Sequence, residues 1–295
     1  MRHTTAPSLA PNGTAIAYIV RDGGYPYAVQ AELTEDGVGR ERPVQLPIEG
    51  PVTRVLHSPD AQWIACEVSP KGSEKLETFT VSTDPGVQGA SPLRNTFDAR
   101  TRLVEWDRDK LAMDAVAADG MTEARLVDPN TSRYQVMDRR IDALLVAAEA
   151  GYSLMRVGPR GNRELLLVTP QGRWMPLLPP EPGATTEDGR ILPITDSRLV
   201  ILVVTDHSAD RRRLLRLVVD INGERPVCVE REEMISNPEA DVDEFAISED
   251  LSTAAVLWNQ AGISNLELLS LGEDQRVQVR RTIELPGMVA AGLSI

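Results

Sequence analysis

The stretch Glu239–Leu271, EADVDEFAISEDLSTAAVLWNQAGISNLELLSL, decides the fold of this protein. Residues 242–247 alternate between two faces with a period of two, and the apolar segments 253–258 and 266–271 follow after polar breaks. A period of two with turn residues between the segments is typical of antiparallel strands joined by tight turns. The stretch therefore predicts three consecutive strands, which make up most of one blade of a β-propeller.

The same unit, a polar turn followed by an apolar run, occurs six times along the chain. The copies recur at a period of roughly 40 to 55 residues, which is the length of one four-stranded blade. They run from Pro11 to Val20, Ser58 to Val68, Trp106 to Val116, Glu149 to Val157, Thr195 to Val204 and Ser248 to Trp258.

We therefore predict an all-β protein, a β-propeller of four-stranded antiparallel blades, as one domain over residues 1–295. The predicted blades span approximately residues 4–48, 51–97, 101–138, 141–180, 187–231 and 240–285, and residues 287–295 form the first strand of a seventh. Composition would allow a helix over Arg139–Ala150, but the repeat predicts a strand there.

A chain with six blades and one further strand leaves two explanations open. A propeller blade packs both faces on its neighbours, so a ring that lacks most of a blade would expose apolar faces and an unpaired edge strand. One explanation is that the chain is part of a longer protein, which we favour. The other is that six blades close on themselves and residues 287–295 cover the seam.

Composition excludes some function classes. The 44 acidic against 31 basic residues give a net charge of -13, which would repel a phosphate backbone, so we expect no nucleic-acid partner. No apolar run approaches the roughly 18 residues of a membrane span, and the amino-terminal residues show no secretory signal, so we expect a cytoplasmic protein with no membrane contact. Cys66 and Cys228 each lie in an apolar run, as expected for small buried hydrophobes in a reducing compartment.

The chain carries no recognisable catalytic site. The Gly-x-Ser-x-Gly string of hydrolases does not occur, and the histidines are His3, His57 and His207. The run Asp206-His207-Ser208 contains the residue types of a catalytic triad, but neighbours along a chain cannot take up the order of contacts that a triad needs. We therefore predict that this run is a structural turn and that the chain contains no catalytic residue.

Metal and cofactor motifs are also missing from the sequence, so we expect neither. The acidic residues Glu239, Asp241, Asp243 and Glu244 are expected to form a solvated turn. The basic run 211–213 is expected to be a solvated face, although it could dock a carboxylate or a partner domain.

Two further carboxylates are candidate substrate-binding residues. Glu232 and Glu233 follow the predicted outer strand of the fifth blade, where they could receive the amino group of a peptide.

Several stretches of the sequence resemble the amino-terminal propeller of actinobacterial peptidases of the prolyl oligopeptidase family, the group of the dipeptidyl aminopeptidases and acylaminoacyl peptidases. The resemblance covers essentially the whole chain and rests on RHTTAPSLAPNGTAIAYIVRDGGYPYAVQAEL, HSPDAQWIACEVSP, RVGPRGNRELLLV and DEFAISEDLSTAAVLWNQAG. In that family a seven-bladed propeller precedes an α/β-hydrolase domain that carries a Ser-Asp-His triad, and the propeller admits peptides while excluding folded proteins.

This resemblance implies a non-catalytic propeller that gates and selects short-peptide substrates, with the α/β-hydrolase domain of the same parent protein as its partner. The chain departs from the family pattern because it ends before the seventh blade closes and contains none of the triad positions. By itself it should hydrolyse nothing. Two alternatives remain open: a stand-alone propeller that binds a protein or peptide, and a propeller with its own catalytic site in a central channel.

Overall fold

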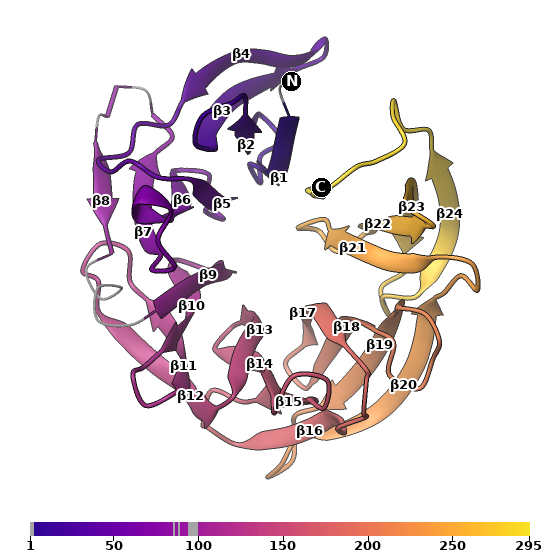
Figure 1. The fold of residues 1–295 in the computed structure, drawn as a ribbon. Coiled ribbons are helices and arrows are strands. Elements are labelled where there is room, and N and C mark those ends of the chain that lie inside the picture. The colour runs from indigo at the N-terminus through magenta and orange to yellow at the C-terminus, as the bar shows by residue number, and fades with distance from the viewer. Residues whose placement is uncertain (1–2, 85, 88, 94–99) are drawn as a thin grey trace. The chain divides into compact units, whose positions relative to one another are not determined.

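The computed structural model describes residues 3–84, 86–87, 89–93 and 100–295. The described residues form strands and turns almost throughout, and the helix among them is the single turn η1, Pro70–Gly72 (Figure 1). A segment long and apolar enough to cross a membrane as a helix is not found in these ranges. The predicted fold class is confirmed, because the strands form six four-stranded antiparallel blades of a β-propeller.

The chain divides into two compact units, one of residues 1–136 with Ser294 and one of residues 137–293 with Ile295. In each blade the four strands pair in sequence order. The first three blades contain β1 His3–Leu9, β2 Ala15–Arg21, β3 Tyr27–Thr34 and β4 Gly37–Pro43; β5 Val52–His57, β6 Trp63–Val68, β7 Glu77–Ser82 and β8 Ala90–Pro92; and β9 Arg100–Asp107, β10 Lys110–Val116, β11 Met121–Val127 and β12 Tyr134–Ile141.

The next three blades follow the same pattern. They contain β13 Ala143–Glu149, β14 Tyr152–Val157, β15 Glu164–Val168 and β16 Trp174–Leu178; β17 Thr186–Thr195, β18 Arg198–Thr205, β19 Arg213–Asp220 and β20 Val227–Ile235; and β21 Asp241–Ile247, β22 Thr253–Gln260, β23 Ile263–Leu271 and β24 Val277–Ile283. The division between the two units falls within β12. The expectation of one domain over 1–295 stays a prediction.

Some observed blade boundaries differ from the predicted ones. The third blade ends at Ile141 and the fifth at Ile235, later than expected, because β12 and β20 continue past the predicted turns. The predicted end of the second blade, residue 97, lies outside the described residues. The segment Arg139–Ala150 is strand as predicted, but it belongs to two strands, because Asp142 has a positive φ of 50° and ends β12 before β13 begins.

A bulge interrupts the first strand of several blades. In β21, Val242 pairs with Trp258 and Glu244 with Leu257, so Asp243 is an extra residue. The alternation predicted over 242–247 therefore shifts by one position, and Val242 and Phe245 are both buried. Matching shifts occur in β5, β9 and β13, so the bulge is part of the repeat.

The polar turns of the repeat have a local hydrogen-bonding reason. In the second blade Ser58 Oγ donates to Asp60 Oδ1 and accepts from the Trp63 amide at 2.9 Å. In the sixth blade Ser248 bonds Asp250 and Thr253 in the same way. These side chains satisfy the backbone of the turn, which is why the Ser-x-Asp pattern predicts a turn between the first two strands of a blade.

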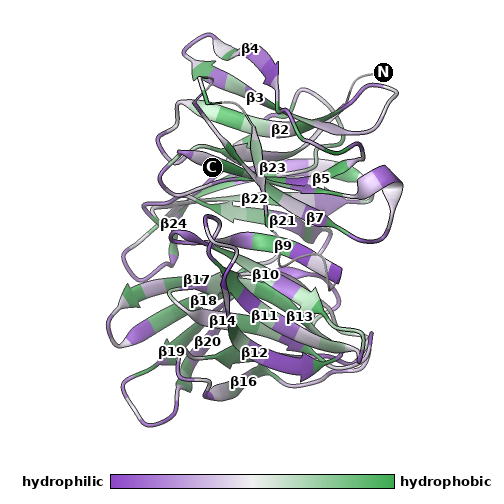
Figure 2. Ribbon diagram, turned by 90° about the vertical axis from the view of Figure 1, so that its left-hand side faces the viewer, coloured by the Kyte–Doolittle hydropathy of each residue, from purple (hydrophilic) through white to green (hydrophobic). Residues whose placement is uncertain are grey.

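The core lies between adjacent blades of each unit. In unit 1 the residues around Ile64 and Phe79 pack against those around Ile19, and in unit 2 a larger cluster surrounds Trp258 and Phe245. Hydrophobic residues concentrate in middle strands such as β2, while outer strands such as β4 are mostly hydrophilic (Figure 2). Cys66 belongs to this core, where burial raises the pKa of its thiol to about 12, and Cys228 is half-buried; both are free thiols.

Residues 287–295 do not form the predicted first strand of a seventh blade. Instead the segment runs beside the start of β23, where the Ser264 amide donates to Met288 O at 2.8 Å and the Ala290 amide to Ser264 Oγ at 3.0 Å. A strand needs a neighbour that completes its ladder, whereas the bonds of this segment to β23 involve the single residue Ser264. The prediction of a strand here is therefore wrong.

Candidate functional site

The two carboxylates proposed to bind a peptide amino group lie on opposite faces of β20. This follows from their adjacent positions in a strand. Glu232 Oε1 accepts from Arg216 Nη1 at 2.9 Å and from Arg276 Nε at 3.1 Å. Glu233 is paired with Arg213 at 3.3 Å. Each carboxylate already has an arginine partner, and their role toward a peptide stays a prediction.

Arg216 is the centre of an ionic cluster that links the fifth and sixth blades. Its side chain is 4% exposed, and its guanidinium contacts Glu230 as well as Glu232 and donates to Asp274 O at 2.8 Å. Partial burial alone would raise the pKa of Glu230. The hydrogen bond and positive charge of Arg216, together with the charge of Arg276, outweigh this effect and hold the pKa of Glu230 below its usual value. This arrangement satisfies a buried charge, which is costly to bury alone.

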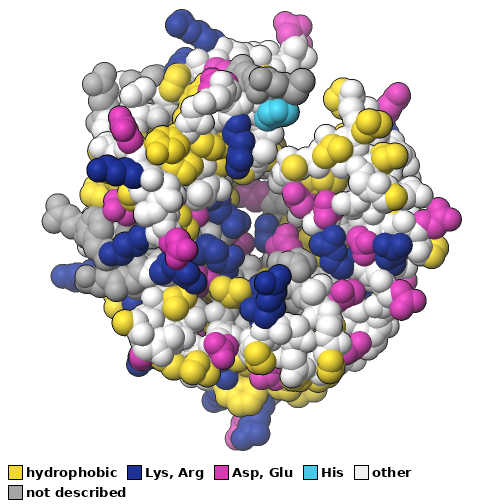
Figure 3. All heavy atoms as spheres, viewed as in Figure 1, with side chains coloured by type: hydrophobic (Ala, Val, Ile, Leu, Met, Phe, Trp, Pro, Cys, Tyr) yellow, Lys and Arg dark blue, Asp and Glu magenta, His cyan; other side chains and the backbone are white. Residues whose placement is uncertain are grey.

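The basic run and the acidic cluster of the sequence meet each other. Arg211 Nη1 lies 3.0 Å from Asp241 Oδ2, and Arg212 Nη2 lies 3.0 Å from Asp243 Oδ1. Two arginines of the basic run therefore dock carboxylates of the neighbouring blade, which was the possibility left open beside the expected solvated face. No three His, Cys, Asp or Glu side chains in the described ranges are grouped to hold a metal ion. On the face shown in Figure 3, acidic and basic side chains are interspersed.

The run Asp206-His207-Ser208 brings two of its three side chains together. Ser208 Oγ lies 3.1 Å from His207 Nδ1, a contact that we did not expect, whereas Asp206 Oδ1 accepts from the Thr185 amide at 2.5 Å. Arg231 Nη2 also lies 3.1 Å from His207 Nδ1. Glu181 Oε2 lies 3.2 Å from the same nitrogen, so His207 Nδ1 contacts two charged side chains besides Ser208, unlike a catalytic base that faces only its nucleophile. The arrangement supports a structural turn.

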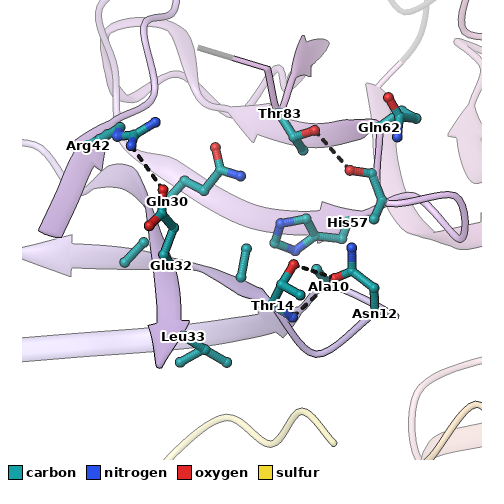
Figure 4. Close-up of a pocket in the computed structure, with 13 residues that line it drawn as sticks. Ala10, Asn12, Thr14, Gln30, Glu32, Leu33, Arg42, His57, Gln62 and Thr83 are labelled. Atoms are coloured by element: carbon teal, nitrogen blue, oxygen red, sulfur yellow. Dashed lines mark hydrogen bonds and ion pairs between the residues drawn. The ribbon is translucent and has the colours of Figure 1, made fainter. Parts of the chain in front are cut away.

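A pocket of about 590 Å³ lies between the first and second blades of unit 1 (Figure 4). It opens where β1, β3, β5 and β7 end. Sequence reasoning did not foresee it, because its walls come from separate turns and strand ends. It is lined by Ala10, Asn12, Thr14, Ala15, Gln30, Ala31, Glu32, Leu33, Arg42, His57, Ala61, Gln62 and Thr83.

His57 is the buried polar residue of this pocket, with 7% of its surface exposed. It is the last residue of β5. Its Nδ1 lies 2.8 Å from Ser8 O, which can only accept, so Nδ1 carries the proton. Burial lowers the pKa of His57, and the bond to Ser8 only partly opposes this, so the ring is neutral at pH 7. Nε2 is then an acceptor, and it has no hydrogen-bond partner within the described ranges.

The signal for His57 in the sequence was weak. The residue ends an apolar alternating segment directly before the Ser58 turn, in a position where the equivalent residue of the sixth blade is Ile247. Other first strands end on polar residues, at Asp107, Glu149 and Thr195, so a histidine at this position did not distinguish the pocket.

The comparisons with known proteins concern the fold. No family model and no curated protein matches the sequence. A prolyl endopeptidase structure is similar with a TM-score of 0.67 and 16% identity, over 97% of this chain and 43% of that one. Prolyl oligopeptidase B from Galerina marginata, bound to a 35mer hydrolysis and macrocyclization substrate, has a TM-score of 0.60 and 13% identity, over 95% of this chain and 43% of that one.

An isolated domain is also similar. The β-propeller domain of the Trilobed protease from Pyrococcus furiosus, which has an open velcro topology, gives a TM-score of 0.61 with 13% identity, over 92% of this chain and 86% of that one. The chain thus spans less than half of the two peptidases but most of the isolated propeller. The resemblance seen in the sequence is confirmed at the level of fold: this chain has the fold of the β-propeller domain of prolyl oligopeptidase-like proteases.

Proposed function

We propose that this chain is the non-catalytic propeller of a serine peptidase of the prolyl oligopeptidase type that acts on short peptides. It restricts access to an active site carried by the α/β-hydrolase domain of the same parent protein. Its free thiols, Cys66 and Cys228, favour a reducing, cytoplasmic location for that protein.

The observation that supports this proposal is the share of each similar structure that this chain matches. The chain matches 86% of a protease propeller solved alone and 43% of a whole prolyl endopeptidase. In that endopeptidase more than half of the chain lies outside the matched part. A segment of that length is long enough for a catalytic domain. The amino acids that this chain itself brings together are engaged in ion pairs and turns, consistent with a supporting role.

The test is made on the native protein. Antibodies raised against this chain would isolate the protein from its host, and intact mass, labelling by a fluorophosphonate and cleavage of aminoacyl and dipeptidyl chromogenic amides would be measured on one sample. We expect a mass roughly twice the 32.3 kDa of this chain and a labelled serine. Pre-treatment with a serine reagent should abolish cleavage, which serves as the control.

The alternative is a stand-alone β-propeller that binds a protein or peptide. The pocket beside His57 favours a binding role, since its volume of about 590 Å³ lies in the range of small-molecule sites, roughly 300–1,000 Å³. A native mass of 32.3 kDa without serine labelling would contradict the peptidase proposal and support this alternative.

A further inference from the structure

The dipeptide Asn-Gly occurs twice in this chain, as Asn12-Gly13 between β1 and β2 and as Asn222-Gly223 between β19 and β20. All four residues are exposed. In this dipeptide the backbone nitrogen of the glycine can attack the side-chain carbonyl carbon of the asparagine, because glycine has no side chain to obstruct the approach and leaves the backbone mobile. The two copies have the same intrinsic chemistry, so the folded structure decides which of them reacts.

At Asn12 the reacting groups are held by hydrogen bonds. Asn12 Oδ1 accepts from the amide of Thr14 at 3.1 Å and from its hydroxyl at 2.7 Å, and the Gly13 amide donates to Ala10 O at 2.8 Å. These three bonds close the turn on itself and fix the side chain that would have to move toward the glycine nitrogen. The Gly13 amide must also give up its bond to Ala10 before it can lose its proton.

At Asn222 the corresponding groups are not held. Within the described part of the chain, neither the Asn222 carboxamide nor the Gly223 amide forms a hydrogen bond. The backbone amide of Asn222 donates to Asp220 Oδ1 at 2.9 Å, which anchors the start of the turn. The side chain of Asn222 and the backbone nitrogen of Gly223 can therefore approach each other without breaking a bond.

We propose that Asn222 is a site of spontaneous deamidation in the folded protein, whereas Asn12 is protected. The Gly223 nitrogen forms a bond to Asn222 Cγ, and the bond from Cγ to the side-chain nitrogen breaks. The proton of the Gly223 amide passes through solvent to the departing nitrogen, which leaves as ammonia, and a five-membered succinimide remains. Water then opens the ring at either of its two carbonyl groups, which gives aspartate or isoaspartate. Nothing is oxidised or reduced, and the reaction does not depend on the proposed peptidase role.

The reaction changes the charge of the turn. The ionised side chains of residues 221–226 are Glu224 and Arg225, one of each sign, so one new carboxylate changes their net charge from zero to -1. The same turn lines a second cavity, of about 860 Å³, beside which Arg173 Nη1 donates to Glu224 O. An isoaspartate lengthens the backbone by one methylene group just before this contact, so the modification alters this wall of the cavity.

The test compares the two copies in one sample. The purified full chain is incubated at mildly alkaline pH, and its tryptic peptides are followed by mass spectrometry over time. Residues 3–21 and 217–231 place the two asparagines in separate peptides. Deamidation should be at least about tenfold faster at Asn222 than at Asn12, because reaction at Asn12 requires three hydrogen bonds to break. Methylation by an isoaspartyl methyltransferase should label peptide 217–231.

Two controls separate the fold from the sequence. In guanidinium chloride, where the hydrogen bonds of both turns are lost, the two asparagines should react at similar rates. Gly223→Ala should slow the reaction at Asn222 several-fold, because its methyl group lies next to the attacking nitrogen. The added Cβ would lie 3.4 Å from Arg225 O, an ordinary contact, so the fold is retained. Gly24→Ala makes the same change in another turn and should leave the rate unchanged.

Three outcomes would overturn the proposal. The first is equal rates at Asn12 and Asn222 in the folded chain. The second is a rate ratio that is the same in guanidinium chloride as in the folded chain, which would assign the difference to neighbouring residues in the sequence. The third is reaction at Asn222 in the denatured chain alone, which would mean that its turn is protected as well.

Discussion

Arg216 and Glu232 face each other across β19 and β20, with Nη1 and Oε1 2.9 Å apart and the arginine side chain 4% exposed. The same guanidinium donates through Nε to Asp274 O, 58 residues away in the sequence. One buried charge thus joins two strands of the fifth blade to a turn of the sixth. The surrounding carboxylates offset the cost of burying the guanidinium. A substitution of Arg216 therefore affects both blades at once.

Arg216→Met should lower the free energy of unfolding by about 2 kcal/mol, the size of lost hydrogen bonds to charged groups. The apolar replacement fills the space but leaves Asp274 O and two carboxylates with fewer donors. Urea unfolding measures the change. Arg42→Met, which breaks an exposed pair with Glu32, is the control and should leave stability nearly unchanged. Equal effects of both variants would mean that burial of Arg216 contributes nothing.

Glu232→Gln tests the proposed role of this carboxylate toward peptides. If Glu232 receives a peptide amino group, the variant should weaken binding of a free-amine dipeptide while an N-acetylated dipeptide binds as before. Glu233→Gln, on the other face of β20, is tested in parallel. Calorimetric titration of the full native protein gives both affinities. A loss of stability with no difference between the two peptides would leave Glu232 as an ion-pair partner of Arg216 and Arg276 alone.

Glu67 should make stability depend on pH. Its carboxylate is buried and accepts from Leu103 N at 2.6 Å and Thr53 Oγ1 at 2.7 Å. Burial raises its pKa, and these two bonds with the charges of Arg54 and Arg102 do not cancel that effect. A folded pKa above the unfolded value of 4.5 gives a contribution to stability that is complete below pH 4.5 and is lost as the pH rises through the folded pKa.

Glu67→Gln keeps an acceptor for Leu103 and does not titrate. Relative to wild type it should therefore become more stable as the pH is raised from 4 toward 8, measured by urea unfolding at each pH. Glu67→Ala leaves the Leu103 amide without its acceptor and should cost about 1–3 kcal/mol at every pH. Parallel pH curves for wild type and Glu67→Gln would show that the carboxyl has no raised pKa.

Gly50 should not tolerate a side chain. A Cβ at this position would lie 2.0 Å from Ser69 O, a backbone atom that cannot rotate away. Gly50→Ala should therefore cost about 1–3 kcal/mol, as overpacking does. Gly24→Ala, where no atom lies within 4 Å of the added Cβ, is the matched control and should be nearly neutral. Thermal unfolding of the two variants distinguishes them, and similar melting temperatures would contradict the close approach.

Much of the fold could be predicted from the sequence because its signals are local. The Ser58 and Ser248 turns close on their own side chains within five residues, and the apolar runs after them form the second strands where the repeat placed them. The bulge at Asp243 could not be predicted, because it depends on how β21 twists against β22. The strand expected at 287–295 failed for a related reason, since pairing requires a partner that no local pattern supplies.

By itself, then, the sequence determined the fold class, the number of complete blades and the absence of a hydrolase motif, because periodicity and turn chemistry act between near neighbours. Only the tertiary structure decided which charges meet and where a cavity forms. Arg216 reaches Asp274, and His57 lies beside Gln30 and Glu32, only when blades pack face to face. Such contacts depend on the register of whole sheets, so they become visible only once the blades are assembled.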